Sequence, residues 1–222
     1  MGQATAKATA QGATPPGWLS PLRLTLSAPG PWLVAASFAM YSGQWLAVVG
    51  FLPTIYAQAG LAPTLNGLLT ALAAAVNMLG NIAAGRLLQR GVAAERLLVT
   101  GFLTMALAAA AAFAGSGEGG GLPPLLRYAA VLLFSGFGGL IPATLFALAL
   151  RVAPAQAAVS TTIGWVQQWS ALGQFGGPPL VAWMASQAGG WHLTWLATGA
   201  CSAVGLVLVA LLTRRLRAAA RR

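Results

Sequence analysis

The chain has 222 residues, of which 58% are hydrophobic and 6% are charged. A soluble domain usually carries about a quarter charged residues, so 12 basic and 2 acidic residues cannot cover a soluble surface, and the composition predicts an all-α membrane protein. The net charge of +10 does not indicate nucleic-acid binding, because the basic residues lie at the ends of apolar runs, where membrane orientation places them.

The first 30 residues are predicted to form a polar cytoplasmic arm. Residues 1–30 are rich in Ala, Thr, Gly and Pro and carry Lys7 and Arg23. The stretch 18–26 suits the membrane interface, although Pro21 limits any helix there.

Six apolar runs follow, and each reaches the roughly 20 residues that a helix needs to cross a bilayer. They cover about 31–57, 65–86, 97–115, 124–150, 157–186 and 192–213, and residues 214–222 form a basic cytoplasmic tail. The glycine-rich loop GSGEGGG divides the runs into two groups of three. This division predicts two inverted three-helix repeats, a pattern found in some transporters.

The basic residues also predict the orientation. If both termini are cytoplasmic, Arg127 is alone on the outside. The inner side then carries Lys7, Arg23, Arg86, Arg90, Arg96, Arg151, Arg214, Arg215, Arg217, Arg221 and Arg222. This asymmetry predicts an N-in/C-in, multi-pass protein of a plasma membrane, the inner membrane in a bacterium.

Polar side chains in the first two runs are candidates for lining a solute path. Tyr41 and Gln44 align on one face with Trp45 beside them, and Tyr and Trp can stack on a solute, although a core role for Trp45 stays equally open. Asn77 and Asn81 lie one turn apart, which favours hydrogen bonding between helices over solute contact.

The fifth run carries three amides. At about 100° per residue, Gln167, Gln168 and Gln174 share one arc, and Trp165 and Trp169 lie opposite. We expect the amides to face the bundle or a water-filled cavity, with the tryptophans towards lipid or a peripheral helix. Bridging between helices and contact with a solute are both open roles for the glutamines.

Glycine and proline mark expected hinges in the fourth and fifth runs. Glycines permit close backbone approach, and a proline frees a carbonyl and can kink a helix, although both can also serve packing alone. The expected hinge residues are Gly138, Gly139, Pro142, Gly176, Gly177 and Pro178.

No cofactor, metal or catalytic residue is expected. The lone Cys201 excludes an intrachain disulfide and a cysteine metal cluster. No Asp, Glu or Lys lies at mid-membrane depth in any run, so no carboxylate proton relay is expected within this chain.

The cytoplasmic loop GRLLQRG resembles the motif Gly-x-x-x-Asp-Arg-x-Gly of the major facilitator superfamily. Gly85 and Arg90 match the motif, Gln89 stands where the Asp is expected, and Gly91 comes one place early. Arg86 suits an inside loop by its charge. The chain from about 20 to 213 is similar to the C-terminal half of such a transporter.

Two further stretches, LIPATLFAL and GQFGGPPL, resemble the cyanate and nitroimidazole branch of the superfamily. The resemblance implies a secondary-active transporter that works by alternating access and carries a small organic or anionic solute. It also implies that the first and fourth helices line the cavity, the second and fifth gate it, and the third and sixth lie outside.

The length implies a missing partner, because these transporters contain two six-helix halves. Besides the bilayer and the solute, we expect a second half as a separate chain, a missing N-terminal half or a second copy. A non-transporting or degenerate fragment or scaffold, a permease subunit and an intramembrane protease are the alternatives. A rhomboid-type protease needs a serine in Gly-x-Ser-Gly and a histidine in a partner helix. Here Ser135-Gly136 follows Phe134, and the one histidine of the sequence, His192, is expected at the membrane interface.

Overall fold

The computed structural model describes residues 19–115 and 120–221, and within this part the secondary structure is entirely helical. The elements are α1 (Leu19–Ser27), α2 (Pro29–Gln58), α3 (Pro63–Gln89), α4 (Ala94–Phe113), α5 (Pro124–Gly138), α6 (Leu140–Val152), η1 (Gln156–Ala158), α7 (Val159–Ala188), η2 (Trp191–Leu193) and α8 (Thr194–Ala219). Most of the arm predicted for residues 1–30 lies outside the described residues.

Five segments of the described chain are long and apolar enough to cross a membrane. They are α2, α3, α4, the combined segment Pro124–Val152 and the segment Trp191–Ala219. α7, which contains the fifth predicted run, is 30 residues long but is not among them. Its glutamines, serines and glycines lower its mean hydropathy, although it is long enough to span.

The structure differs from the sequence expectation at both ends of the described chain. The end of the predicted polar arm is the helix α1, where Pro21 lies in the first turn and its missing N–H costs no helical hydrogen bond. The indole N–H of Trp32 donates to the Leu26 carbonyl over 2.9 Å and ties α1 to α2. At the other end, α8 continues to Ala219, so the predicted tail extends the last helix.

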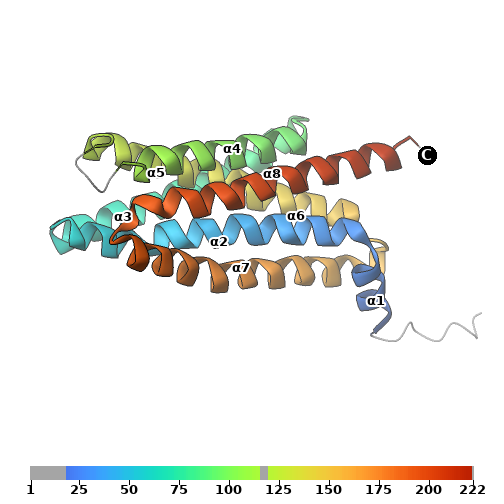
Figure 1. Ribbon diagram of the computed structural model, residues 1–222. Coiled ribbons are helices and arrows are strands. Elements are labelled where there is room, and N and C mark those ends of the chain that lie inside the picture. The colour runs from blue at the N-terminus through green and yellow to red at the C-terminus, as the bar shows by residue number, and fades with distance from the viewer. Residues whose placement is uncertain (1–18, 116–119, 222) are drawn as a thin grey trace, which may run out of the picture.

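The helix α2 is the centre of the bundle. It packs most extensively against α7 and also contacts α8, α6, α3 and α5, while α4 packs against α8 and α5 (Figure 1). The starts of α2, α4 and α7 and the ends of α3, α6 and α8 lie at one end of the bundle. We call this end, which carries the C-terminus, the basic end.

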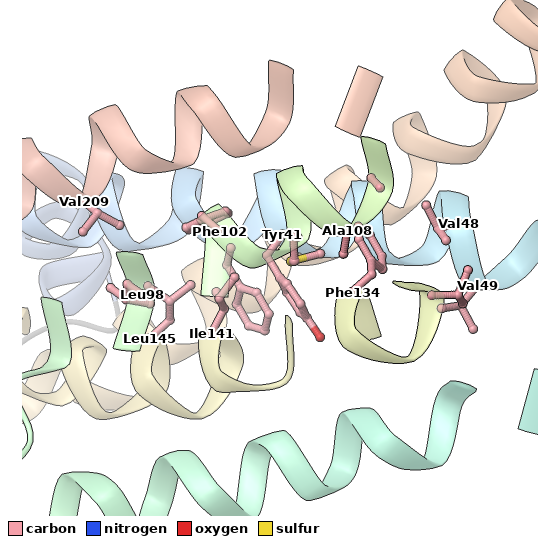
Figure 2. Packing of buried hydrophobic residues seen from close by; sticks show 14 of the residues in the cluster. Tyr41, Val48, Val49, Leu98, Phe102, Ala108, Phe134, Ile141, Leu145 and Val209 are labelled. Atoms are coloured by element: carbon pink, nitrogen blue, oxygen red, sulfur yellow. The ribbon is translucent and has the colours of Figure 1, made fainter. Parts of the chain in front are cut away.

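Apolar side chains from the neighbouring helices fill the space around α2. Phe102, Phe134, Ile141 and Leu145 of α4, α5 and α6 are fully buried and pack on the α2 face that contains Tyr41 (Figure 2). Within a bilayer, lipid tails are as apolar as these side chains, so van der Waals fit rather than water exclusion stabilises this packing.

Glycines bring the backbones of α2 and α7 into contact. A Cβ added at Gly43 would lie 2.8 Å from the Gly173 carbonyl oxygen, and one added at Gly177 would overlap the Gly43 carbonyl. The Ser42 hydroxyl donates to the Ser170 carbonyl over 2.8 Å at the same crossing. Small residues at such crossings are typical of membrane helix pairs.

We predict that Gly177→Ala destabilises the chain, because its methyl group must push α7 away from the Gly43 carbonyl. The expected loss is about 1–3 kcal/mol of unfolding free energy, measured by denaturant unfolding of the purified chain. Gly176→Ala is the matched control: Gly176 is exposed with nothing within 4 Å, so stability should be unchanged or higher. Equal effects of the two substitutions would contradict the crossing.

Candidate polar site between α2, α3 and α5

Four of the predicted site residues meet in one hydrogen-bonded cluster with a fifth, Ser135. The Asn77 amide nitrogen donates to the Tyr41 hydroxyl oxygen over 3.0 Å and to the Ser135 carbonyl over 2.8 Å. The Trp45 indole N–H donates to the Ser135 hydroxyl over 3.0 Å, and the Asn81 amide donates to the Asn77 carbonyl over 3.1 Å. We call these five residues the Tyr41 cluster.

The Tyr41 cluster joins three helices across the centre of the chain. Tyr41 is 5% exposed, and its hydroxyl points out of the apolar core towards α3 (Figure 2). Asn77 uses both amide hydrogens on partners from α2 and α5, which satisfies a polar group that hydrocarbon cannot. The geometry agrees with the sequence interpretation of hydrogen bonds between helices for Asn77, whereas Asn81 bonds Asn77 of its own helix.

The cluster lies beside the interruption between α5 and α6 at Gly139. A Cβ at Gly139 would overlap the Asn77 carbonyl, and a Cβ at Gly80 would overlap the Gly136 carbonyl. Gly138 is less tight, since its Cβ would lie 3.1 Å from the Met105 sulfur and 3.4 Å from the Tyr41 ring. The glycines therefore let α3 approach closely enough for the Asn77 side chain to reach the α5 backbone.

Gln44 is not part of the Tyr41 cluster. It is 2% exposed and faces α8, where the Ser202 hydroxyl donates to its carbonyl oxygen over 3.0 Å. Its amide nitrogen is buried without a hydrogen-bond partner. The sequence places Tyr41 and Gln44 on one face of a helix, but in the structure Tyr41 bonds α3 and Gln44 bonds α8.

The amides of α7 do not face the bundle of this chain, and the direction expected for the tryptophans, towards lipid or a peripheral helix, is wrong. Gln167, Gln168 and Gln174 are exposed, and Gln174 bonds only the Ser170 hydroxyl of its own helix, over 3.2 Å. The opposite face packs inward, because Trp165 and Trp169 contact the ring of Trp32 on α2, with ring centroids 4.8 and 5.6 Å apart. Gly173 and Gly177 of α7 let this face approach the backbone of α2 closely.

The expected hinge residues differ in their surroundings. Pro142 is buried near the start of α6, three residues after the interruption at Gly139. Pro178 lies inside α7, which continues to Ala188 instead of ending at the Gly-Gly-Pro-Pro run. Gly177 touches α2, whereas Gly176 faces open space.

The cytoplasmic loop motif is not locked by a carboxylate in the described chain. Gly85, Arg86 and Arg90 lie at the end of α3, and no ion pair joins the two arginines to a described acid. Glu95 of α4 instead pairs with Arg217 of α8 over 2.6 Å. Both partners are well exposed, so this ion pair contributes about 1 kcal/mol at most.

Several of the contacts involve residues that the sequence analysis did not single out as site residues. Ser135, Ser42 and Ser202 each bridge α2 to another helix. The signal for them was weak, because serine is common in membrane helices and a single hydroxyl does not reveal its partner.

The side chains of the Tyr41 cluster offer hydrogen bonding. No three His, Cys, Asp or Glu side chains gather anywhere in residues 19–115 and 120–221. The hydrogen bonds of the Tyr41 cluster connect α2, α3 and α5 through amide, indole and hydroxyl groups.

Comparison with known proteins gives one family. The model of the Major Facilitator Superfamily matches residues 33–222, which is most of the chain. No curated protein matches it. The match is to the superfamily as a whole and does not distinguish the cyanate and nitroimidazole branch.

We predict that Tyr41 and Asn77 are energetically coupled. A double-mutant cycle with Tyr41→Phe and Asn77→Ala, followed by unfolding of the purified chain, should give a coupling energy of about 0.5–2 kcal/mol. Pairing Tyr41→Phe with Ser186→Ala, at an exposed site, should be additive. Additivity in the first pair would show that the hydroxyl–amide contact contributes nothing.

Proposed function

The chain belongs to the major facilitator superfamily, a family of membrane transporters, and on this basis we propose that it is one six-helix half of a secondary transporter. It moves a small organic or anionic solute by rocking against a second half, with no chemical step. The branch resemblance of 140–148 and 173–180 supports a solute of the cyanate or nitroimidazole kind.

The exposed amide face of α7 is the observation that carries the proposal. Gln167, Gln168 and Gln174 point away from every helix of their own chain, while the opposite face of α7 is packed on α2. Amides facing hydrocarbon cost free energy, so this face must meet protein or water in the membrane. A second half with a water-filled path between the halves meets that requirement.

The long apolar faces of α3 and α7 also suit a partner or lipid. The middle of α3 is the least buried of the candidate spans, and Leu68, Met78 and Leu79 are each more than 60% exposed. On α7, Phe175 is 80% exposed one residue after Gln174. Alternating polar and apolar groups on one exposed face are typical of a surface that contacts protein and water together.

The charge distribution supports the orientation that we propose. The nine described arginines other than Arg127 lie at or next to the basic end, and Arg127 lies at the opposite end. By the positive-inside rule, the basic end faces the cytoplasm of a plasma membrane, the inner membrane in a bacterium.

We predict that the chain alone does not transport. Proteoliposomes that contain only this chain as a monomer should take up neither cyanate nor a nitroimidazole above protein-free vesicles, because one half presents one wall of the path. Adding the second six-helix half should restore uptake. Uptake by the isolated monomer would overturn the half-transporter proposal.

We predict that the amide face serves the solute and not the stability of this chain. Gln167→Ala and Gln174→Ala in the assembled transporter should each lower the initial uptake rate about two- to tenfold, the effect of one lost hydrogen bond. The unfolding free energy of the chain should change by less than about 0.5 kcal/mol, because both side chains are exposed.

Gln187→Ala is the control for this measurement. Gln187 is exposed on the same helix but lies on the opposite arc, so its removal should leave uptake unchanged. Unchanged uptake with lower stability in Gln167→Ala and Gln174→Ala would identify the amides as structural contacts.

A further inference from the structure

A groove of about 360 Å³ lies at the basic end of the bundle. One side is formed by the end of α1 and the first residues of α2, including Trp32 and Leu33. The other side is formed by Leu211 and Arg215, which lie one turn apart on the same face of α8. Figure 1 shows the α1–α2 junction and the end of α8 at this end of the bundle.

The contacts of Trp32 hold the first side of the groove in place. Its indole N–H donates to the Leu26 carbonyl over 2.9 Å, so this donor is not available to a ligand. Its ring packs edge to face on Trp165 and Trp169. Trp32 is still 38% exposed, and Leu211 on the other side is 43% exposed. The groove therefore presents apolar surface that the described chain leaves partly uncovered.

Positive charge gathers at the same groove. The side chain of Arg215 is exposed in its wall, so an anion can reach it. The 30-residue helix α2 begins at Pro29, which also lines the groove, and its first turn carries no acidic residue. The dipole of α2 adds a partial positive charge at this point. The groove therefore favours an anionic group.

The sequence provides no carboxylate side chain for this groove. Its two acidic residues are Glu95 and Glu118, and residues 1–18 contain none. Glu95 pairs with Arg217 over 2.6 Å. Glu118 belongs to the α4–α5 connection, which leaves and rejoins the described chain at the opposite end of the bundle. A headgroup amine would therefore find no counterion in the groove, whereas an anionic headgroup needs none.

The apolar and charged parts of the groove follow the order of a phospholipid. Leu211 lies one turn before Arg215 on a helix that ends at the basic end, so the apolar part is nearer the middle of the bundle. Tryptophan is enriched at the membrane interface, where Trp32 would lie. α1 exposes Leu19 and Leu24, which suits a helix at the same depth.

We propose that this groove binds an anionic phospholipid of the leaflet at the basic end. The phosphate contacts Arg215 and the start of α2, and an acyl chain lies against Leu211, Leu33 and Trp32. The neighbouring arginines of α8 favour a headgroup with net negative charge. The site is separate from the amide face of α7 and requires neither a second half nor transport.

Phosphatidylglycerol and phosphatidylcholine with identical acyl chains are matched probes, because they differ in headgroup charge. The detergent-solubilised full chain is titrated with each lipid, and bound lipid is counted by native mass spectrometry. The Kd should be at least about tenfold lower for phosphatidylglycerol, and Arg215→Gln should raise this Kd about three- to tenfold. Equal affinity for the two lipids, or an unchanged Kd in Arg215→Gln, would overturn the site.

Arg214→Gln is the matched control for the charge. Arg214 is the exposed neighbour of Arg215 on α8 but does not line the groove, so the Kd should change by less than about twofold. Equal effects of the two substitutions would show nonspecific attraction to the basic end and overturn the groove. Lys7→Gln should leave the Kd unchanged, whereas a rise as large as in Arg215→Gln would move the site to the arm.

Two further measurements distinguish a lipid from a soluble anion. Leu211→Ala should raise the Kd of both lipids about two- to fivefold, because it shortens the apolar wall and keeps the charge. Val207→Ala, at an exposed position of α8 outside the groove, should leave both values unchanged. Glycerol 3-phosphate at millimolar concentration should not displace phosphatidylglycerol.

Displacement by glycerol 3-phosphate, or an unchanged Kd in Leu211→Ala, would assign the groove to a soluble phosphate and overturn the lipid. An equal rise in Kd in Leu211→Ala and Val207→Ala would place the acyl chain on α8 in general and also contradict the groove. None of these results depends on uptake, so the lipid site and the transport proposal can fail independently.

Discussion

Hydrogen-bonding groups inside an apolar bundle must find partners within the protein, and the fold depends on how α2 meets this requirement. Tyr41 and Trp45 bond α3 and α5, Ser42 bonds the backbone of α7, and Gln44 accepts from α8. Each of these contacts satisfies a polar group that lipid would leave unpaired. One central helix thus positions four others by directed contacts, in a chain where apolar burial has no direction.

Small residues make these contacts possible. Asn77 reaches the Ser135 carbonyl because Gly80 and Gly139 let the backbones of α3 and α5–α6 touch. Gly43 and Gly177 have the same effect between α2 and α7. The glycines and the polar side chains therefore act together, since a wider separation at either crossing would leave an amide or a hydroxyl unpaired.

Some polar groups are not satisfied by the bundle itself. The amides of α7 lie on its outer face, where protein or water from outside the chain must meet them. The Nε and Nη2 atoms of Arg127 and the Tyr56 hydroxyl are buried without hydrogen-bond partners at the end of the bundle opposite the basic end. In the transporter half that we propose, the amides of α7 lie on the surface between the halves.

The sequence by itself determined the membrane class, the helical elements to within a few residues at most boundaries, and which residues share a face, because run length and the 100° repeat are local properties. It also predicted that Asn77 takes part in contacts between helices. Only the tertiary structure decided which neighbour each face meets. Periodicity grouped the three glutamines opposite Trp165 and Trp169, but the glycine crossing turned the tryptophan face onto α2 and the amides outward. A cavity at the end of the bundle opposite the basic end likewise needs the α2–α3, α4–α5 and α7–η2 connections, which are far apart in the sequence, and no local pattern records that they meet.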